Sequence, residues 1–187
     1  MRSGEERSDQ VNQDGLKRWP SGRPQLGAGT SLCDLLDPRY VVLQLEATDK
    51  NAILAELSSL LVADQPKDVQ GAILDALIQR EEVGSTGIGD GVAIPHARTA
   101  AVQTIRVAAG VCQEGLDFQS LDGNPVYVFF LILTPAAAAG AHLKLLAELT
   151  RLLRFARVRE ALRSATTAHE FCQVLRAAAS GAMECGS

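Results

Sequence analysis

One stretch of this 187-residue chain stands out: Arg80-Glu-Glu-Val-Gly-Ser-Thr-Gly-Ile-Gly-Asp-Gly-Val-Ala-Ile-Pro-His-Ala-Arg98. Its glycine-rich part, residues 84–91, cannot form a helix or a long strand, because glycine has too much backbone freedom to favour either. Residues 92–94 are predicted to form a short strand, which Pro95 ends. We therefore expect His96 in an accessible loop directly behind a strand end.

Two amphipathic helices are predicted on the N-terminal side of this stretch. Tyr40–Leu45 is rich in β-branched residues and is typical of a strand, and Thr48 after it is a candidate N-cap. Pro66 is suited to the first turn of the second helix, which leads into Arg80. Apolar residues recur at the spacing of buried helix faces. They are Ile53, Leu54, Leu57, Leu60 and Leu61 in the first helix and Val69, Ile73, Ala76 and Leu77 in the second.

Strands and helices also alternate on the C-terminal side. Residues 105–111 are a strand candidate, residues 115–125 are a turn-rich connection, and residues 126–133 are nearly all apolar. A continuous apolar run is typical of a central strand that is covered on both faces. The predicted helices span 141–155, 158–164 and 168–179. This order predicts an α/β fold, a single domain with one mixed sheet of about four or five strands flanked by helices.

The composition indicates a globular protein that does not depend on nucleic acid. A chain of this length buries about 70% of its unfolded surface, and 47% of its residues are hydrophobic. The formal net charge is -4 and only 4% of the residues are aromatic, which argues against phosphate-backbone binding and base stacking. No run approaches the roughly 18 apolar residues of a membrane span, so no membrane insertion is expected.

The two ends of the chain differ from its middle. Residues 1–30 are polar and glycine-rich and are predicted to be a flexible tail, with a short second tail over 181–187 and the folded domain over 31–180. The N-terminus lacks the apolar region of a secretory signal. The four cysteines form no CxxC pair, which indicates separate reduced thiols. A cytoplasmic location is therefore expected.

His96 is a candidate functional residue by its position. Pro95 fixes the backbone beside it, and the neighbouring glycines let a ligand or a partner come close. Strand ends of α/β folds are also where functional groups gather. The alternative is an ordinary loop histidine that is exposed to water.

The other two histidines lie on predicted helices. His142 precedes three leucines at helical spacing, so we expect it at the edge of the core, near a helix N-terminus that favours anions. The alternative for His142 is a half-buried histidine bonded to a neighbouring carbonyl group. His169 lies among polar residues and is expected to be a solvated surface side chain.

Arg80 continues the inward-facing stripe of its predicted helix. A buried guanidinium needs a partner, because an unpaired buried charge is costly. One interpretation is a salt bridge with Glu81 or Glu82. The other is a guanidinium aimed at a phosphoryl group, which its fork of N–H donors matches.

Several motifs of known chemistry do not fit this sequence. The glycines of 87–91 follow a helix rather than a strand and lack the spacing of a dinucleotide fingerprint, and no Gly-Lys-Ser/Thr of a P-loop is present. The histidines do not have helical metal-ligand spacing, although His96 and His142 could meet in space. A metal site that uses both histidines therefore stays an alternative.

The sequence is similar to that of a known protein family. The stretch 80–98 resembles the signature of the enzyme IIA domains of the bacterial phosphoenolpyruvate-dependent phosphotransferase system, in the fructose, mannitol and nitrogen-regulatory class. Leu32–Pro38, Gly115–Pro125 and His142–Leu149 resemble the family's start, its middle and the helix that carries its second histidine. The resemblance covers about residues 32–178 and implies the enzyme IIA fold.

The resemblance also implies site residues and partners. His96 would accept the phosphoryl group as a neutral imidazole, Arg80 would bind the phosphoryl oxygens, and His142 would donate a hydrogen bond to them. A loop would shape the site and add backbone N–H donors. Its residues are Ser85, Thr86, Gly87 and Gly89. No metal or other cofactor is implied. The expected donor is the phosphocarrier HPr or its nitrogen-branch relative.

Three roles remain open for such a chain. The first is a nitrogen or metabolic regulatory phosphocarrier whose phosphorylation state controls a target such as a transporter or a kinase. The second is phosphoryl donation to an enzyme IIB for fructose- or mannitol-type sugar uptake. The third, from another class, is a protein-binding regulator that has lost phosphotransfer, and the presence of Arg80, His96 and His142 argues against it.

Overall fold

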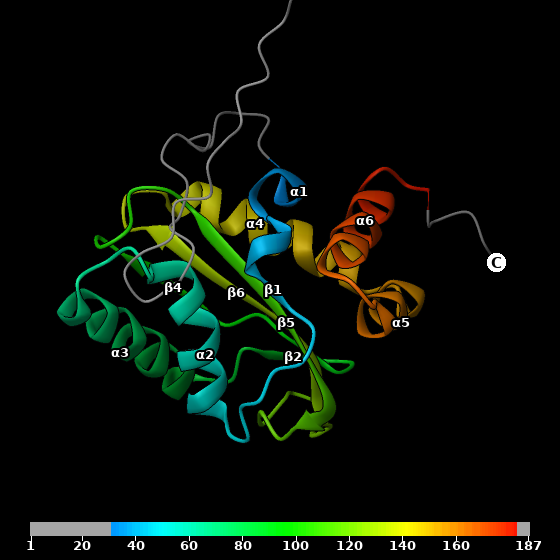
Figure 1. Cartoon of the computed structure of the whole chain (residues 1–187), viewed down its shortest axis with the longest axis horizontal. Coiled ribbons are helices and arrows are strands. Elements are labelled where there is room, and N and C mark those ends of the chain that lie inside the picture. The colour runs from blue at the N-terminus through cyan, green and yellow to red at the C-terminus, as the bar shows by residue number, and fades with distance from the viewer. Residues whose placement is uncertain (1–30, 183–187) are drawn as a thin grey trace, which may run out of the picture.

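The computed structural model describes residues 31–182, so the predicted tail over 1–30 and all but two residues of the one over 181–187 lie outside the described residues. In this range most of the strands follow one another directly, with helices before and after them in the chain, so the alternation expected from the sequence is not observed (Figure 1). The helices are α1 (Leu32–Leu35), the 3-10 helix η1 (Pro38–Tyr40), α2 (Lys50–Val62), α3 (Lys67–Val83), α4 (Ala139–Leu153), α5 (Ala156–Ser164) and α6 (Ala168–Ala179). The strands are β1 (Val41–Val42), β2 (Gly87–Gly89), β3 (Val92–Ala93), β4 (His96–Thr99), β5 (Arg106–Leu116) and β6 (Val126–Pro135).

The strands form one mixed six-stranded sheet in the order β1-β5-β6-β3-β2, with β4 also paired to β6. β5 and β6 are antiparallel, whereas β3 and β4 both run parallel to β6. The predicted α/β class is confirmed. So is the central place of the apolar strand 126–133, because β6 has neighbours on both sides and every residue from Val128 to Thr134 is buried.

Helices cover both faces of this sheet. Figure 1 shows α2 and α3 on one side and α1, α4, α5 and α6 on the other. Each side has its own apolar core, one around Phe118 and Phe129 and the other around Phe130 and Phe171. Alternate residues of β6 contribute to the two cores, as the period-two side-chain pattern of a strand requires. In the described range no helix is long and apolar enough to cross a bilayer.

The prediction of a strand over Tyr40–Leu45 is wrong for most of its length. Pro38 and Asp37 start a 3-10 turn instead, in which the Asp37 side chain accepts the Arg39 N–H. This turn buries the Tyr40 ring, and only two residues then pair with β5 before the chain bends. After the bend at residues 43–44, the Leu45 N–H donates to the Val111 carbonyl of β5 at 3.0 Å.

The helices largely confirm the predicted spacing, with small errors at their ends. Asp49, not Thr48, is the N-cap of α2, because its carboxylate accepts the Ala52 N–H at 2.9 Å. Pro66 occupies the N-cap position of α3 rather than its first turn. Helix α4 lies two residues earlier than expected, and α6 matches the predicted 168–179.

Strand β4 was not predicted from the sequence, as α1, η1 and β2 were not, and it carries His96. The expectation of a loop histidine is wrong, since His96 is the first residue of β4 and pairs in register with Ile132 of β6. Arg98 pairs in the same way with Thr134. Side chains of His96 and Arg98 therefore point to the same face of the sheet, the face that α4 covers.

Candidate functional site

The imidazole of His96 is fixed by its own backbone neighbourhood. Its Nδ1 atom lies 2.7 Å from the carbonyl oxygen of Ile94. A carbonyl oxygen can only accept a hydrogen bond, so Nδ1 carries the proton and donates it. The Nε2 atom of the neutral ring then keeps its lone pair. This tautomer makes Nε2 the nucleophilic nitrogen of the side chain.

Arg80 reaches this nitrogen from the last turn of α3. Its Nε–H donates to Nε2 of His96 at 3.2 Å, and its Nη1 donates to the carbonyl oxygen of Gly84 at 2.9 Å. Within residues 31–182 Arg80 forms no salt bridge with Glu81 or Glu82, so the salt-bridge interpretation does not hold there. The guanidinium instead faces the nucleophilic atom of His96, where it would meet an incoming anion.

His142 approaches the same site from the fourth residue of α4. It is 7% exposed, which confirms the predicted position at the edge of the core. The centroids of the His96 and His142 rings are 5.0 Å apart, with an angle of 59° between the planes. The Nδ1 atom of His142 lies 3.0 Å from the hydroxyl oxygen of Thr134. Its partner is thus a hydroxyl group rather than the backbone carbonyl considered as the alternative.

Both imidazoles are neutral near pH 7. Burial is the main cause that lowers the pKa of His96, and the Arg80 charge adds to it, while the Ile94 carbonyl and Glu81 act in the opposite direction. Burial, with the positive charges of His96, Arg98 and Arg80, lowers the pKa of His142 to about 4. A neutral imidazole has the lone pair that attack on phosphorus needs.

The glycine-rich loop holds the site in place but does not point its donors at it. The Thr86 N–H donates to the carboxylate of Glu81 at 3.0 Å, the Gly87 N–H donates to Ser85 Oγ, and the Gly89 N–H donates to Ser120 Oγ. These three groups are already satisfied, so the expectation that they serve as free backbone donors is corrected.

The loop instead positions Ile94, the residue two places before His96. The carbonyl oxygen of Thr86 accepts the Ile94 N–H at 3.0 Å, and the Ile94 carbonyl in turn accepts the His96 Nδ1–H. Glu81 anchors Thr86 through its N–H and its hydroxyl group. A chain of hydrogen bonds therefore leads from Glu81 to the tautomer of His96.

With this geometry in view, the comparisons with known proteins are informative. Residues 34–178 match the family described as "Phosphoenolpyruvate-dependent sugar phosphotransferase system, EIIA 2". The chain belongs to this family. The resemblance predicted from the stretch 80–98 is thereby confirmed, and so is the assignment as a phosphotransferase component with a phosphocarrier role.

Individual EIIA relatives are similar over most of their length. The "Nitrogen regulatory protein" of Pseudomonas aeruginosa is 36% identical over 141 residues, which are 75% of this chain and 92% of that protein. The "PTS system fructose-specific EIIA component" of Haloferax volcanii is 36% identical over 146 residues, 78% of this chain and 95% of that protein. The crystal structure of the nitrogen regulatory protein IIA-Ntr from Neisseria meningitidis superimposes with a TM-score of 0.72 at 32% identity, covering 77% of this chain and 98% of that one.

Three residues at this EIIA site were not singled out from the sequence. Glu81 anchors the loop, Arg98 is an exposed cation on the same face as His96, and Thr134 is buried against His142. No local pattern pointed to Arg98, because its place on the face of His96 depends on strand β4. Thr134 was detectable as a lone hydroxyl at the end of an apolar run. His169, by contrast, is exposed as predicted.

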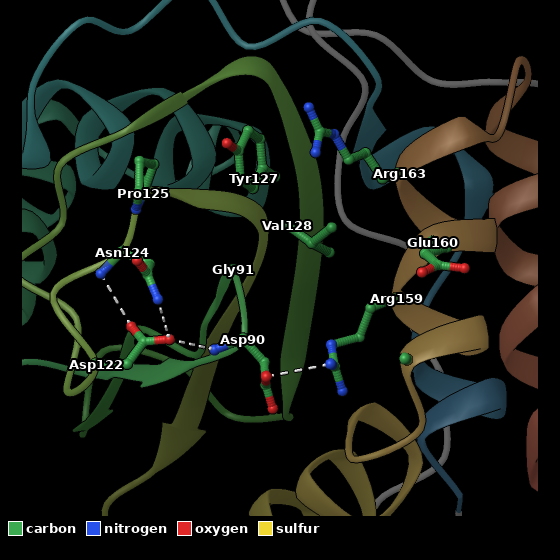
Figure 2. Close-up of a pocket in the computed structure, with 11 residues that line it drawn as sticks. Asp90, Gly91, Asp122, Asn124, Pro125, Tyr127, Val128, Arg159, Glu160 and Arg163 are labelled. Atoms are coloured by element: carbon green, nitrogen blue, oxygen red, sulfur yellow. Dashed lines mark hydrogen bonds and ion pairs between the residues drawn. The ribbon is translucent and has the colours of Figure 1, made fainter.

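A cavity of about 430 Å³ lies elsewhere on the EIIA domain, between the β2–β3 turn and α5 (Figure 2). Two of its charged groups, Arg159 and Asp90, pair at 3.2 Å, and Asp122 accepts the Asn124 N–H. None of Arg80, His96 and His142 lines it. The site predicted from the sequence is therefore separate from this cavity.

Among residues 31–182, no group of three or more His, Cys, Asp or Glu side chains is arranged to hold a metal ion.

Proposed function

We propose that Nε2 of His96 is the atom that accepts and carries the phosphoryl group in this EIIA domain. The observation that supports this assignment is the Nδ1–H···O=C bond to Ile94, which leaves the Nε2 lone pair directed toward the guanidinium of Arg80. The neutral state of the ring near pH 7 supports the same assignment.

The proposed step balances without any further reagent. The Nε2 lone pair attacks the phosphorus of a donor phosphohistidine, the new N–P bond forms, and the N–P bond of the donor breaks. The proton on Nδ1 stays in its bond to the Ile94 carbonyl throughout, so no general base is required. The donor phosphohistidine carries a proton on its other ring nitrogen, so its histidine leaves as the neutral imidazole.

Charge stabilisation is the main task left to the protein. The Arg80 guanidinium, which bonds Nε2 in the free state, would turn its N–H groups to the phosphoryl oxygens. His142 would donate one N–H to them from the opposite side. Arg98 would add a second positive charge on the same face, and Ser85, Thr86, Gly87 and Gly89 would keep Ile94 and His96 in position.

The proposed biological role is that of a cytoplasmic regulatory phosphocarrier. HPr or its nitrogen-branch relative would supply the phosphoryl group, and the phosphorylation state of His96 would control binding to a target such as a transporter or a kinase. This role is favoured because the chain covers 92% of a relative whose name is "Nitrogen regulatory protein".

A second candidate role is sugar uptake through an enzyme IIB. The observation in its favour is that a relative named "fructose-specific EIIA component" is also 36% identical. Mixing the phosphorylated protein with a purified fructose-type enzyme IIB would separate the two roles. Rapid transfer to the enzyme IIB supports uptake, and retention of the phosphoryl group supports regulation.

The central proposal is tested by intact-mass analysis after incubation with phosphoenolpyruvate, enzyme I and HPr at neutral pH. We expect a gain of one acid-labile phosphoryl group in the wild type and none in His96→Ala. His169→Ala is the matched control, because His169 is an exposed histidine and should leave labelling intact. Full labelling of His96→Ala would overturn the assignment.

A further inference from the structure

Thr134 is an unusual residue for its place in the fold. It is the only hydroxyl in the buried run 128–134 of β6, and its side chain is fully buried, with 0% exposed. Its register partner on β4 is Arg98, two pairs beyond His96 and Ile132. Thr134 therefore lies on the same face of the sheet as His96, under the first turn of α4.

The hydroxyl of Thr134 has one partner in the described part of the chain. This partner is Nδ1 of His142, 3.0 Å from the hydroxyl oxygen. Two arrangements satisfy this distance. Either the hydroxyl donates to Nδ1, or Nδ1–H donates to the hydroxyl oxygen.

The two arrangements present opposite groups to the phosphoryl site. A neutral imidazole has one N–H, so the nitrogen that does not contact Thr134 is a donor in the first arrangement and a lone pair in the second. His142 is neutral near pH 7, and its Nε2 is the nitrogen that the Thr134 contact leaves open. A lone pair at Nε2 would repel an anionic phosphoryl group on His96, whereas an N–H would bind it.

We propose that Thr134 is a positioning residue whose hydroxyl donates to Nδ1 of His142 and so holds that imidazole as the Nε2–H tautomer, ready to bind the phosphoryl group on His96. The inference rests on the proposed function, because it assigns a role toward the phosphoryl group there. This role explains why a hydroxyl group is buried in β6, where its partner is His142. It also gives His96 and His142 opposite tautomers, one with the proton on Nδ1 and the other with it on Nε2.

The test is long-range ¹H–¹⁵N NMR of the imidazole rings in the full chain at pH 7. In the free wild type we expect a deprotonated Nδ1 and a protonated Nε2 for His142. Thr134→Ser should keep this pattern, and Thr134→Val should lose it in part or entirely. A protonated Nδ1 in the wild type would overturn the inference, and that spectrum does not depend on any variant being folded.

The functional consequence is measured as the equilibrium of phosphoryl transfer from phosphorylated HPr. We expect Thr134→Val to lower the equilibrium constant about tenfold, as for the loss of one hydrogen bond to a charged group, and Thr134→Ser to restore it. Thr150→Val, which removes an exposed hydroxyl from the same helix as His142, is the control and should change nothing. An unchanged equilibrium in Thr134→Val would overturn the inference.

The two proposals fail in different ways. If wild-type protein takes up no phosphoryl group, the proposed function fails, while the spectrum of the free protein still decides the direction of the Thr134–His142 bond. If the wild type is phosphorylated on His96 and His142 has its proton on Nδ1, only the inference about Thr134 fails.

Discussion

The guanidinium of Arg80 donates its Nε–H to Nε2 of His96 across 3.2 Å, so the free site already holds a cation against its nucleophilic atom. This contact has two opposing effects on the proposed phosphoryl transfer. In the proposed transfer, it occupies the lone pair that would attack phosphorus, and it keeps in place a positive charge for the transferred group. Since the same guanidinium also binds the Gly84 carbonyl, it is anchored at one end and can turn at the other.

Replacing Arg80 by Ala should slow phosphoryl transfer about 100-fold, the magnitude of losing one preorganised donor to a developing charge. Arg80→Lys should recover part of the rate, because lysine restores the charge without the planar fork. The measurement is the single-turnover rate from phosphorylated HPr. Gln79→Ala, on the exposed face of the same helix, should transfer at the wild-type rate. Equal rates for wild type and Arg80→Ala would leave the arginine a structural role only.

The pH dependence of His96 follows from its lowered pKa. Protonation removes the Nε2 lone pair, and burial lowers the pKa of His96 below its usual 6.5. Uptake should therefore be independent of pH above about 6.5 and fall only at lower pH. Because the Arg80 charge helps to lower this pKa, Arg80→Ala should move the midpoint to higher pH. An NMR titration of the His96 ring gives both midpoints, and a wild-type midpoint above 6.5 would contradict the expectation.

Stability should depend on pH through His142. Its pKa is about 4 in the folded protein and near 6.5 in the unfolded chain, so between these values only the unfolded chain binds the proton. The stabilisation is fully present above pH 6.5 and is lost as the pH falls toward 4, with a slope of at most about 1.4 kcal/mol per pH unit for one proton.

This dependence is separated from that of the carboxylates by comparison with His142→Gln. Urea unfolding of both proteins at pH 7 and pH 4.5 should show that the free energy of unfolding falls more for the wild type than for His142→Gln. Parallel losses in the two proteins would mean that His142 binds the proton equally in its folded and unfolded states.

The sequence predicted the parts of this fold that depend on local periodicity. Helices α2, α3 and α6 follow from apolar residues at three- and four-residue spacing, and β6 follows from its apolar run. Strand β4 could not be predicted in the same way, because Ala97 is its only buried residue and its pairing partners begin at Ile132, 36 residues later. The strand exists because β6 offers a free parallel edge there.

The three residues that the structure brings together were predictable from the sequence, but their contacts were not. The residue types and spacing in 80–98 pointed to Arg80 and His96, and the helical stripe pointed to His142. The expected donors of the loop were wrong because Thr86 and its neighbours bind to Glu81 and to other side chains of the loop. Such contacts are set by how α3 ends against the loop, which no local pattern encodes.

Glu81 should matter for both stability and chemistry. Its buried carboxylate accepts from Thr86 N–H, Thr86 Oγ1 and Lys50 Nζ. Glu81→Gln places an amide donor against these donors and should destabilise the fold by about 1–3 kcal/mol. Because the Glu81 charge raises the pKa of His96, the variant should also lower the midpoint of the His96 titration. Glu82→Gln, exposed on the same turn, is the control in urea unfolding and in the NMR titration, and identical behaviour of the two variants would refute this role.

Gly87 should be the least replaceable glycine of the site loop. A Cβ atom there would lie 2.9 Å from Cα of Ser120, so the backbone of one of the two segments has to move. The same segments are joined by the Leu121 N–H, which donates to the Gly87 carbonyl at 3.1 Å, and by the Gly89 N–H on Ser120 Oγ. We expect Gly87→Ala to destabilise the fold by about 1–3 kcal/mol, the usual effect of overpacking.

The backbone shift caused by Gly87→Ala should also affect His96. Thr86, next to Gly87, holds the Ile94 N–H, and Ile94 fixes the His96 tautomer, so phosphoryl uptake by the folded variant should slow as well. Gly71→Ala is the control and should stabilise the fold. A Cβ at Gly71 meets nothing within 4 Å, and alanine favours the α3 helix by about 0.5–1 kcal/mol. Urea unfolding and single-turnover uptake of both variants test this. A Gly87→Ala protein as stable and as fast as the wild type would show that β2 and the Ser120 segment are not held against each other.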